Sequence, residues 1–282
     1  MVALIGVFVV LAAIIGGYKM EHGNLAVLFQ PAEFVIIFGA ALGSLIISSP
    51  LHVLKAVVSS VAKVFTSHGM SKEGYLDILG LLNEIFTKMR KEGLIAIEDD
   101  IENPAESPIF TKYPGSLKNK KALSFICDNI KVIISTNVTP YELENIMDME
   151  SEAYSNEAIA PANSVAKVAD ALPGLGIVAA VLGVVLTMGK ISEPPEVLGH
   201  SIGAAMVGTF LGVLMCYGFV GPIATNLEHS AHEDMISFLV IKVSLVSFVG
   251  GAAPQIAVEF GRRVIPTKEK PTFEELEAAI RK

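Results

Sequence analysis

The sequence predicts an all-α membrane protein with four transmembrane helices and a helical cytoplasmic domain inserted between the second and the third. Four apolar stretches contain no Asp, Glu, Lys or Arg, and they lie at residues 2–18, 34–49, 172–189 and 198–221. A helix needs roughly 20 apolar residues to span a bilayer. The mean hydropathy of +0.56 argues against a soluble α protein, because one core of this size would have to bury all four stretches.

The first two stretches are the shortest. Residues 2–18 meet the lower limit of about 17 residues for a transmembrane helix, and residues 34–49 reach it only when the flanking Pro31 and Pro50 are counted. The N-terminal stretch has no preceding basic segment and no small-residue cleavage pattern after it. We therefore expect a membrane helix there rather than a signal peptide.

Outside these stretches the sequence also reads as helical. Asn103, Thr139 and Thr272 are each followed three residues later by glutamate, a pattern typical of a helix N-terminus. A fifth apolar stretch, residues 236–253, has Lys242 in its middle. Since a lysine at the bilayer centre costs about 2.5–3.5 kcal/mol, we expect a buried or amphipathic cytoplasmic helix there.

The chain is therefore divided into four predicted parts. They are a first transmembrane helix pair (1–50), a cytoplasmic helical domain (51–170), a second transmembrane pair (171–222) and a cytoplasmic helical tail (223–282).

The orientation of the spans follows from positive charge near their ends. Lys55, Lys63 and Lys167 flank the spans on the side of the insert, against Lys19 and Lys190 in the two short loops. This slight bias favours a cytoplasmic insert and tail.

Several kinds of chemistry are excluded by what the sequence lacks. The formal net charge of −8 without a basic stripe argues against nucleic-acid binding. No phosphate-binding GxxxxGK[ST] motif, HExxH, CxxC or GxSxG occurs, so we predict no enzyme, no cofactor and no metal site. His229 and His232 have metal-ligand spacing, but such a pair is more typical of a solvated helix face. Cys127 and Cys216 imply no disulfide.

The positive signals are small residues, prolines and segregated charge. Small residues recur every fourth position in the spans, as at Gly39 and Gly43, which permits close helix packing in lipid. Pro173 and Pro222 mark predicted span boundaries or hinges, and Pro173 suits the first turn of a helix. A basic cluster at 88–91 precedes an acidic cluster at 98–102, which is typical of a solvated surface or of an electrostatic docking surface.

Several segments carry a family resemblance over nearly the whole chain. They are residues 205–212 (AMVGTFLG) with Pro222 following, 172–180 (LPGLGIVAA), 30–33 (QPAE), 99–104 (DDIENP) and 257–262 (AVEFGR). Together with the two-plus-two arrangement of spans, they resemble the MotA family of flagellar motor stator proteins, within the MotA/TolQ/ExbB proton channel superfamily.

The resemblance implies a multi-pass protein of the bacterial inner membrane that forms a pentameric ring around MotB. MotB carries the ion-binding aspartate, and the ring passes torque to the rotor protein FliG. This would explain why the four stretches themselves carry no carboxylate.

The resemblance also implies roles for individual residues. Arg90 and Glu98 match positions that bind the rotor, and Thr209 and Ala180 match positions along the ion path. Pro173 and Pro222 match prolines of conformational coupling. Alanine at position 180 favours protons over sodium as the coupling ion. Asp100 and its charged neighbours are expected to be surface charge only.

Two alternatives remain open at this point. One is an ExbB/TolQ-like proton-channel subunit that energises outer-membrane processes, although such proteins usually have three spans. The other is a membrane scaffold without ion flux.

Overall fold

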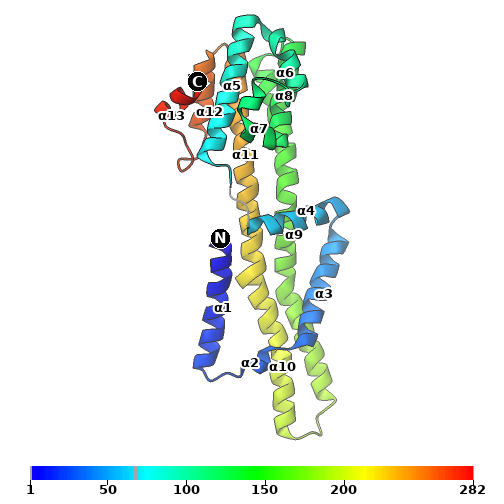
Figure 1. Ribbon diagram of the computed structural model, residues 1–282. Coiled ribbons are helices and arrows are strands. Elements are labelled where there is room, and N and C mark those ends of the chain that lie inside the picture. Colours follow the sequence, from blue (N-terminus) through cyan, green and yellow to red (C-terminus); the bar gives the residue numbers. More distant parts are fainter. Residues whose placement is uncertain (1, 66–68, 282) are drawn as a thin grey trace. The chain divides into compact units, whose positions relative to one another are not determined.

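The computed structural model describes residues 2–65 and 69–281, and every regular element in these residues is a helix (Figure 1). The chain forms two compact units. The span unit consists of Met1–Ser67 and Ala158–His229, and the insert unit consists of His68–Glu157 and Ser230–Lys282. Two long helices, α9 (Pro140–Met188) and α11 (Gly221–Val249), contribute residues to both units.

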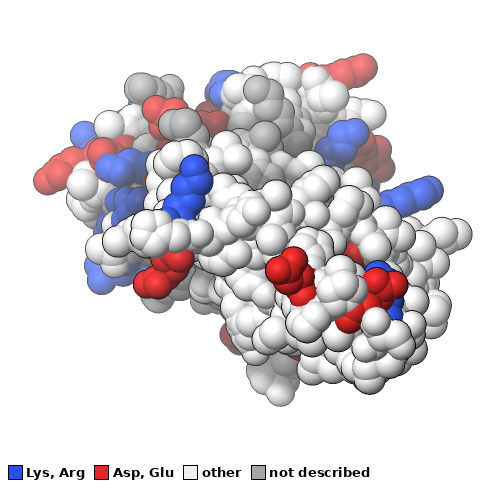
Figure 2. Space-filling model, turned by 90° about the horizontal axis from the view of Figure 1, so that it is seen from below, with Lys and Arg blue, Asp and Glu red and all other residues white. Residues whose placement is uncertain are grey.

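Within residues 2–65 and 69–281, four helical segments are long and apolar enough to cross a membrane, as the sequence predicts. The first is α1 (Val2–Met20), and the second is α3 (Pro31–Ser48) with the short α2 (Leu25–Leu28) before it. The third is α9, and the fourth joins α10 (Pro195–Leu214), the π-helix η3 (Met215–Val220) and α11. Figure 2 shows one face of the molecule, on which uncharged residues dominate.

Helices continue through both prolines predicted as span boundaries. The prediction that Pro173 lies in the first turn of a helix is wrong, because it lies inside the continuous helix α9. Pro222 is the second residue of α11, which follows η3 directly. Interior prolines are tolerated in membrane helices because neighbouring groups can satisfy the freed backbone carbonyls. The apolar composition changes at these prolines, but the helix continues.

The insert unit is a helical domain with an aromatic core. Its further helices are α5 (Lys72–Glu92), η1 (Leu94–Ile97), α6 (Glu98–Glu102), η2 (Phe110–Lys112), α7 (Pro114–Lys118), α8 (Lys120–Ser135), α12 (Pro254–Arg263) and α13 (Phe273–Ile280). Phe86 of α5 stacks on Phe248 of α11 with ring centroids 4.4 Å apart. The fifth apolar stretch is confirmed as a buried helix: Val240 and Leu245 are fully buried, while Lys242 pairs with Asp148 at 2.5 Å.

Two of the three predicted helix starts are confirmed. The Glu142 carboxylate accepts hydrogen bonds from the Thr139 N–H and hydroxyl at the start of α9, and Thr272 with Glu275 forms a capping box at α13. The third is wrong, because Asn103 follows the end of α6 and a turn comes after it.

α4 (Leu51–Val64) follows the second span after a short break at Ser49 and Pro50. Val57 is buried on one side of this helix, whereas Leu51 and Val58 remain exposed. Its apolar and polar residues are segregated around the axis, which is typical of a helix that lies along a surface.

Candidate functional sites

Helices α9 and α10 cross in backbone contact. A methyl group on Gly212 would lie 2.5 Å from the Leu172 carbonyl oxygen, and one on Gly176 would lie 2.7 Å from that of Gly208. The blocking atoms are backbone, so a side chain at either position would force the helices apart. The small-residue stripes predicted on the third and fourth spans therefore serve packing within one chain.

The two predicted ion-path residues lie at this crossing. Thr209 follows Gly208 on α10, and its Cα is 3.3 Å from the place where a Gly176 methyl would lie. The Ala180 nitrogen on α9 is 3.2 Å from the place where a methyl group on Gly208 would lie. Both Ala180 and Thr209 are half-buried. The structure thus brings together two residues that are far apart in sequence.

A carboxyl group that the sequence analysis left outside the spans lies beside them. Glu33 is the third residue of α3, with 8% of its surface exposed. A methyl group on Gly208 would lie 2.5 Å from Glu33 Oε2, and one on Gly183 would lie 3.7 Å from Oε1. The signal that could have revealed it is Pro31, which suits the first turn of a helix and therefore places Glu33 inside that turn.

The predicted coupling prolines occupy different environments. Pro173 has no N–H to donate to the carbonyl four residues earlier in α9. Pro222 follows the π-helix η3, where the Gly221 N–H donates to the Cys216 carbonyl five residues back. A methyl group on Gly221 would lie 2.7 Å from that oxygen. The π-turn therefore depends on glycine at this position, and such turns often occur at functional sites.

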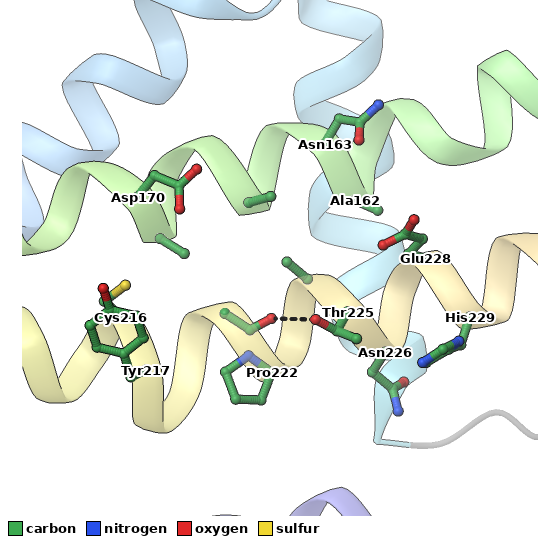
Figure 3. A pocket seen from close by; sticks show the side chains of 14 residues that line it. Ala162, Asn163, Asp170, Cys216, Tyr217, Pro222, Thr225, Asn226, Glu228 and His229 are labelled. Carbon is green, nitrogen blue, oxygen red and sulfur yellow. Dashed lines mark hydrogen bonds between the residues drawn. The ribbon is translucent and has the colours of Figure 1, made fainter.

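A cavity of about 580 Å³ lies next to Pro222 within the span unit. One wall comes from α9, with Asn163 and Asp170, and the other from η3 and α11, with Cys216, Pro222 and Thr225. Figure 3 shows these two walls and the hydrogen bond that the Thr225 hydroxyl donates to the Gly221 carbonyl at 3.3 Å. Because polar groups line the cavity, water can enter it.

The predicted rotor-binding residues lie at one end of α5. Arg90 is in its last turn, and Glu98 begins α6 after the short helix η1. Both side chains are exposed. Gly93 allows the reversal between them with φ of 98°. The Arg90 guanidinium donates to the Ala252 carbonyl at 3.0 Å. This hydrogen bond restrains the end of the side chain, although the residue is exposed.

A buried ion pair fixes the segment that carries Glu98. Lys88 Nζ lies 2.7 Å from Asp100 Oδ2, and the Ser107 hydroxyl donates to Asp100 Oδ1 at 2.6 Å. The same hydroxyl oxygen accepts the Ile109 and Phe110 N–H groups. Asp100 is 5% exposed, so the expectation of surface charge is wrong at this residue. Lys88 belongs to the basic cluster and Ser107 lies outside both clusters, and no sequence spacing rule pairs either residue with Asp100.

No group of three or more His, Cys, Asp or Glu that suits a metal ion occurs in the described part of the chain. Cys127 and Cys216 are both buried free thiols. Burial raises the pKa of the Cys127 thiol to about 11, so that thiol is protonated at neutral pH.

Comparison with known protein families gives two matches. Residues 4–93 match the model described as "Motility protein A N-terminal", and residues 118–238 match that of the "MotA/TolQ/ExbB proton channel family". The second model describes channel subunits rather than enzymes.

Individual proteins are similar over almost the full length. Motility protein A of Escherichia coli K12 is 44% identical over 100% of this chain and 95% of its own length. Chemotaxis protein LafT of Vibrio parahaemolyticus is 36% identical over 97% of this chain and 96% of its own length. Among solved structures, C. jejuni MotAB matches with a TM-score of 0.77 at 18% identity, covering 96% of this chain and 98% of that chain. The MotAB stator complex of Bacillus subtilis matches with a TM-score of 0.71 at 24% identity, covering 94% of this chain and 96% of that chain.

Proposed function

Because the chain belongs to the motility protein A family of flagellar motor stator subunits, we propose that copies of it form a ring around the membrane helices of MotB. MotB supplies the ion-binding aspartate, and ion flow turns the ring against the rotor protein FliG. The observation that carries this proposal is the α9–α10 crossing, where Ala180 and Thr209 lie close together on stretches of these helices that contain no Asp, Glu, Lys or Arg. Each elementary charge crossing 100 mV supplies roughly 2.3 kcal/mol.

The ring requires a face for the neighbouring copy, and α3 supports this part of the proposal. A methyl group on Gly39 or Gly43 would meet no atom within 4 Å, so this small-residue stripe is not used for packing within the chain. Such stripes allow another membrane helix to approach closely. Five copies are the ring order that the family resemblance implies.

We place the protein in the bacterial inner membrane with the insert and the C-terminus in the cytoplasm. The bias of Lys55, Lys63 and Lys167 toward one side supports this orientation. α4 carries two of these lysines beside exposed Leu51 and Val58, which suits contact with lipid at the cytoplasmic surface. In this orientation, residues 1–50 and 171–222 are the two transmembrane pairs, and residues 51–170 and 223–282 are cytoplasmic.

The rotor-binding role of Arg90 and Glu98 rests on their exposure and opposite charge. Opposite charges on neighbouring exposed positions fix the register of a partner and steer its approach. Pro173 and Pro222 would couple ion binding to helix movement, and the π-turn before Pro222 supports a change of shape there. Ala180 adds no hydroxyl ligand, which favours protons as the coupling ion.

Expression with MotB in a non-motile strain that lacks both stator genes tests this function. We expect restored swimming and MotB-dependent proton flux. R90E and E98K should each lower torque, and a compensating reversal on FliG should restore part of it. Normal swimming in both single variants would remove the docking role.

Flux without any effect on swimming would favour an ExbB/TolQ-like channel subunit, and absence of MotB-dependent flux would favour a scaffold. The early spans, matched by the motility protein A model, make the first alternative the weaker one.

A further inference from the structure

Glu33 is an acidic side chain buried among the spans of this chain. It belongs to the first turn of α3 and is 8% exposed, although the sequence around it reads as the end of a loop. Its Oε2 has no hydrogen-bond partner among the described residues. A polar atom that is buried without a partner destabilises the fold, and a bare carboxylate destabilises it more.

The carboxyl group occupies space that two glycines leave open. Gly208 on α10 faces Oε2, and Gly183 on α9 faces Oε1. A methyl group at Gly208 would come within 2.5 Å of the acid, so the absence of a side chain there admits it. Buried polar atoms without a hydrogen-bond partner are few in folded proteins, so the unpartnered Glu33 Oε2 needs an explanation.

The position is adjacent to the proposed ion path. Gly208 precedes Thr209 directly, and the Ala180 nitrogen lies 3.2 Å from the place of the missing Gly208 methyl. The acid therefore lies against Gly208, the residue next to both predicted path positions.

The parts of α2, α3, α9 and α10 that surround Glu33 carry no other charged side chain that would shift its protonation. α3 and α2 contain no second titratable residue, and residues 171–188 of α9 contain none. On α10 the nearest titratable residue is His200, eight positions before Gly208, or about 12 Å along the helix. The protonation of Glu33 thus depends mainly on its burial and on the water or ions that occupy the proposed ion path.

We propose that Glu33 is a second proton-exchanging carboxyl group of the ion path, supplied by this chain. This inference rests on the proposed stator function. In the step, a hydronium ion from the outer side protonates the Glu33 carboxylate and leaves as water. The O–H bond then breaks, and the proton passes through water or the Thr209 hydroxyl to the partner's carboxylate. Glu33 is left ionised and ready to accept the next proton, so atoms and charge balance.

The test compares E33Q, E33D and the matched control E21Q in complexes with MotB reconstituted into vesicles. Glutamine keeps the shape but carries no exchangeable acid proton, so E33Q should reduce proton flux at least about tenfold. E33D should retain part of the flux with a changed dependence on external pH. Glu21 is exposed, and E21Q should conduct like the wild type.

Equal flux and equal pH dependence in E33Q and wild type, at equal assembly, would show that Glu33 only stabilises the N-terminus of α3. That outcome overturns the proposal while leaving the stator function intact. If wild type itself shows no MotB-dependent flux, the proposed function fails instead.

A second measurement covers the case in which E33Q does not assemble. Infrared spectra of a complex in which the MotB aspartate is replaced by asparagine should retain a protonated carboxyl band that titrates with external pH and shifts in E33D. A spectrum in which no such band titrates would overturn the proposal.

Discussion

The α9–α10 crossing and the core of the insert unit hold helices together by opposite means. At the crossing, Gly176 and Gly212 bring the backbones of α9 and α10 into contact. In the insert unit, Phe86 and Phe125 are fully buried against rings of α11: Phe86 stacks on Phe248, and Phe125 meets Phe238 edge-on. Removal of apolar surface from water stabilises the second arrangement, whereas lipid offers no such gain and the first depends on close packing. Enlarging a residue should therefore damage the crossing, and shrinking one should damage the core.

The largest expected effect is on the core. F86A removes a fully buried ring that stacks on Phe248, so we expect the free energy of unfolding of the insert unit to fall by about 3–5 kcal/mol. Thermal unfolding of the purified full chain would show this as a lower midpoint. I95A is the matched control: Ile95 is 71% exposed, and its change should stay within about 0.5 kcal/mol. Equal midpoints for the two variants would contradict the comparison.

The next effect concerns the buried ion pair beside the core. D100N weakens the hydrogen bonds from Lys88 and Ser107, with an expected loss of about 1.5–3 kcal/mol. The segment carrying Glu98 should also exchange its amide hydrogens faster. D99N, at an exposed neighbour, serves as the control. If both variants exchanged at the wild-type rate, Asp100 would not hold this segment.

At the crossing the opposite substitution is informative. G212A adds one methyl group against the backbone of α9, and overpacking of this kind costs about 1–3 kcal/mol. We expect less assembled complex in membranes and weaker swimming. G203A lies on the same helix, where a methyl group meets nothing within 4 Å, and should behave like wild type. Similar behaviour of the two variants would mean that α9 and α10 do not pack through Gly212.

The smallest effect is a pH dependence in the insert unit. Hydrogen bonds from the Arg262 guanidinium, at 2.6 and 2.7 Å, hold the pKa of Glu259 below its usual value. A lowered pKa adds stability above the usual carboxyl range, and that stability is lost as the pH falls through the folded-state pKa. R262Q should lower the free energy of unfolding at neutral pH by less than about 1 kcal/mol and make it depend less on pH in the acid range. If the stability of R262Q fell with acid pH as it does in the wild type, the Arg262–Glu259 pair would not be the cause of that pH dependence.

Local sequence patterns predicted the features that depend on local chemistry. The four spans follow from apolar length, and the caps at Thr139 and Thr272 follow from a hydroxyl and a glutamate three residues apart. The same pattern failed at Asn103. Pro104 disfavours helical backbone in the residue before it, and the Ser107 hydroxyl is held by Asp100.

Features that depend on distant residues were not predictable. The burial of Asp100 requires Lys88 and Ser107, and that of Glu33 requires open space at Gly183 and Gly208. Roles assigned through resemblance, such as those of Arg90 and Thr209, remain predictions that placement alone does not test.

The π-helix at Met215–Val220 sets the angular phase of the helix that follows. A wider turn accommodates one residue more than an α-turn, and each residue in an α-helix advances by about 100°. Deleting one residue within this turn would convert it to ordinary helix and bring later positions back toward the phase of α10. The side of α11 that presents Pro222 and Thr225 to the cavity is therefore chosen by a single extra residue.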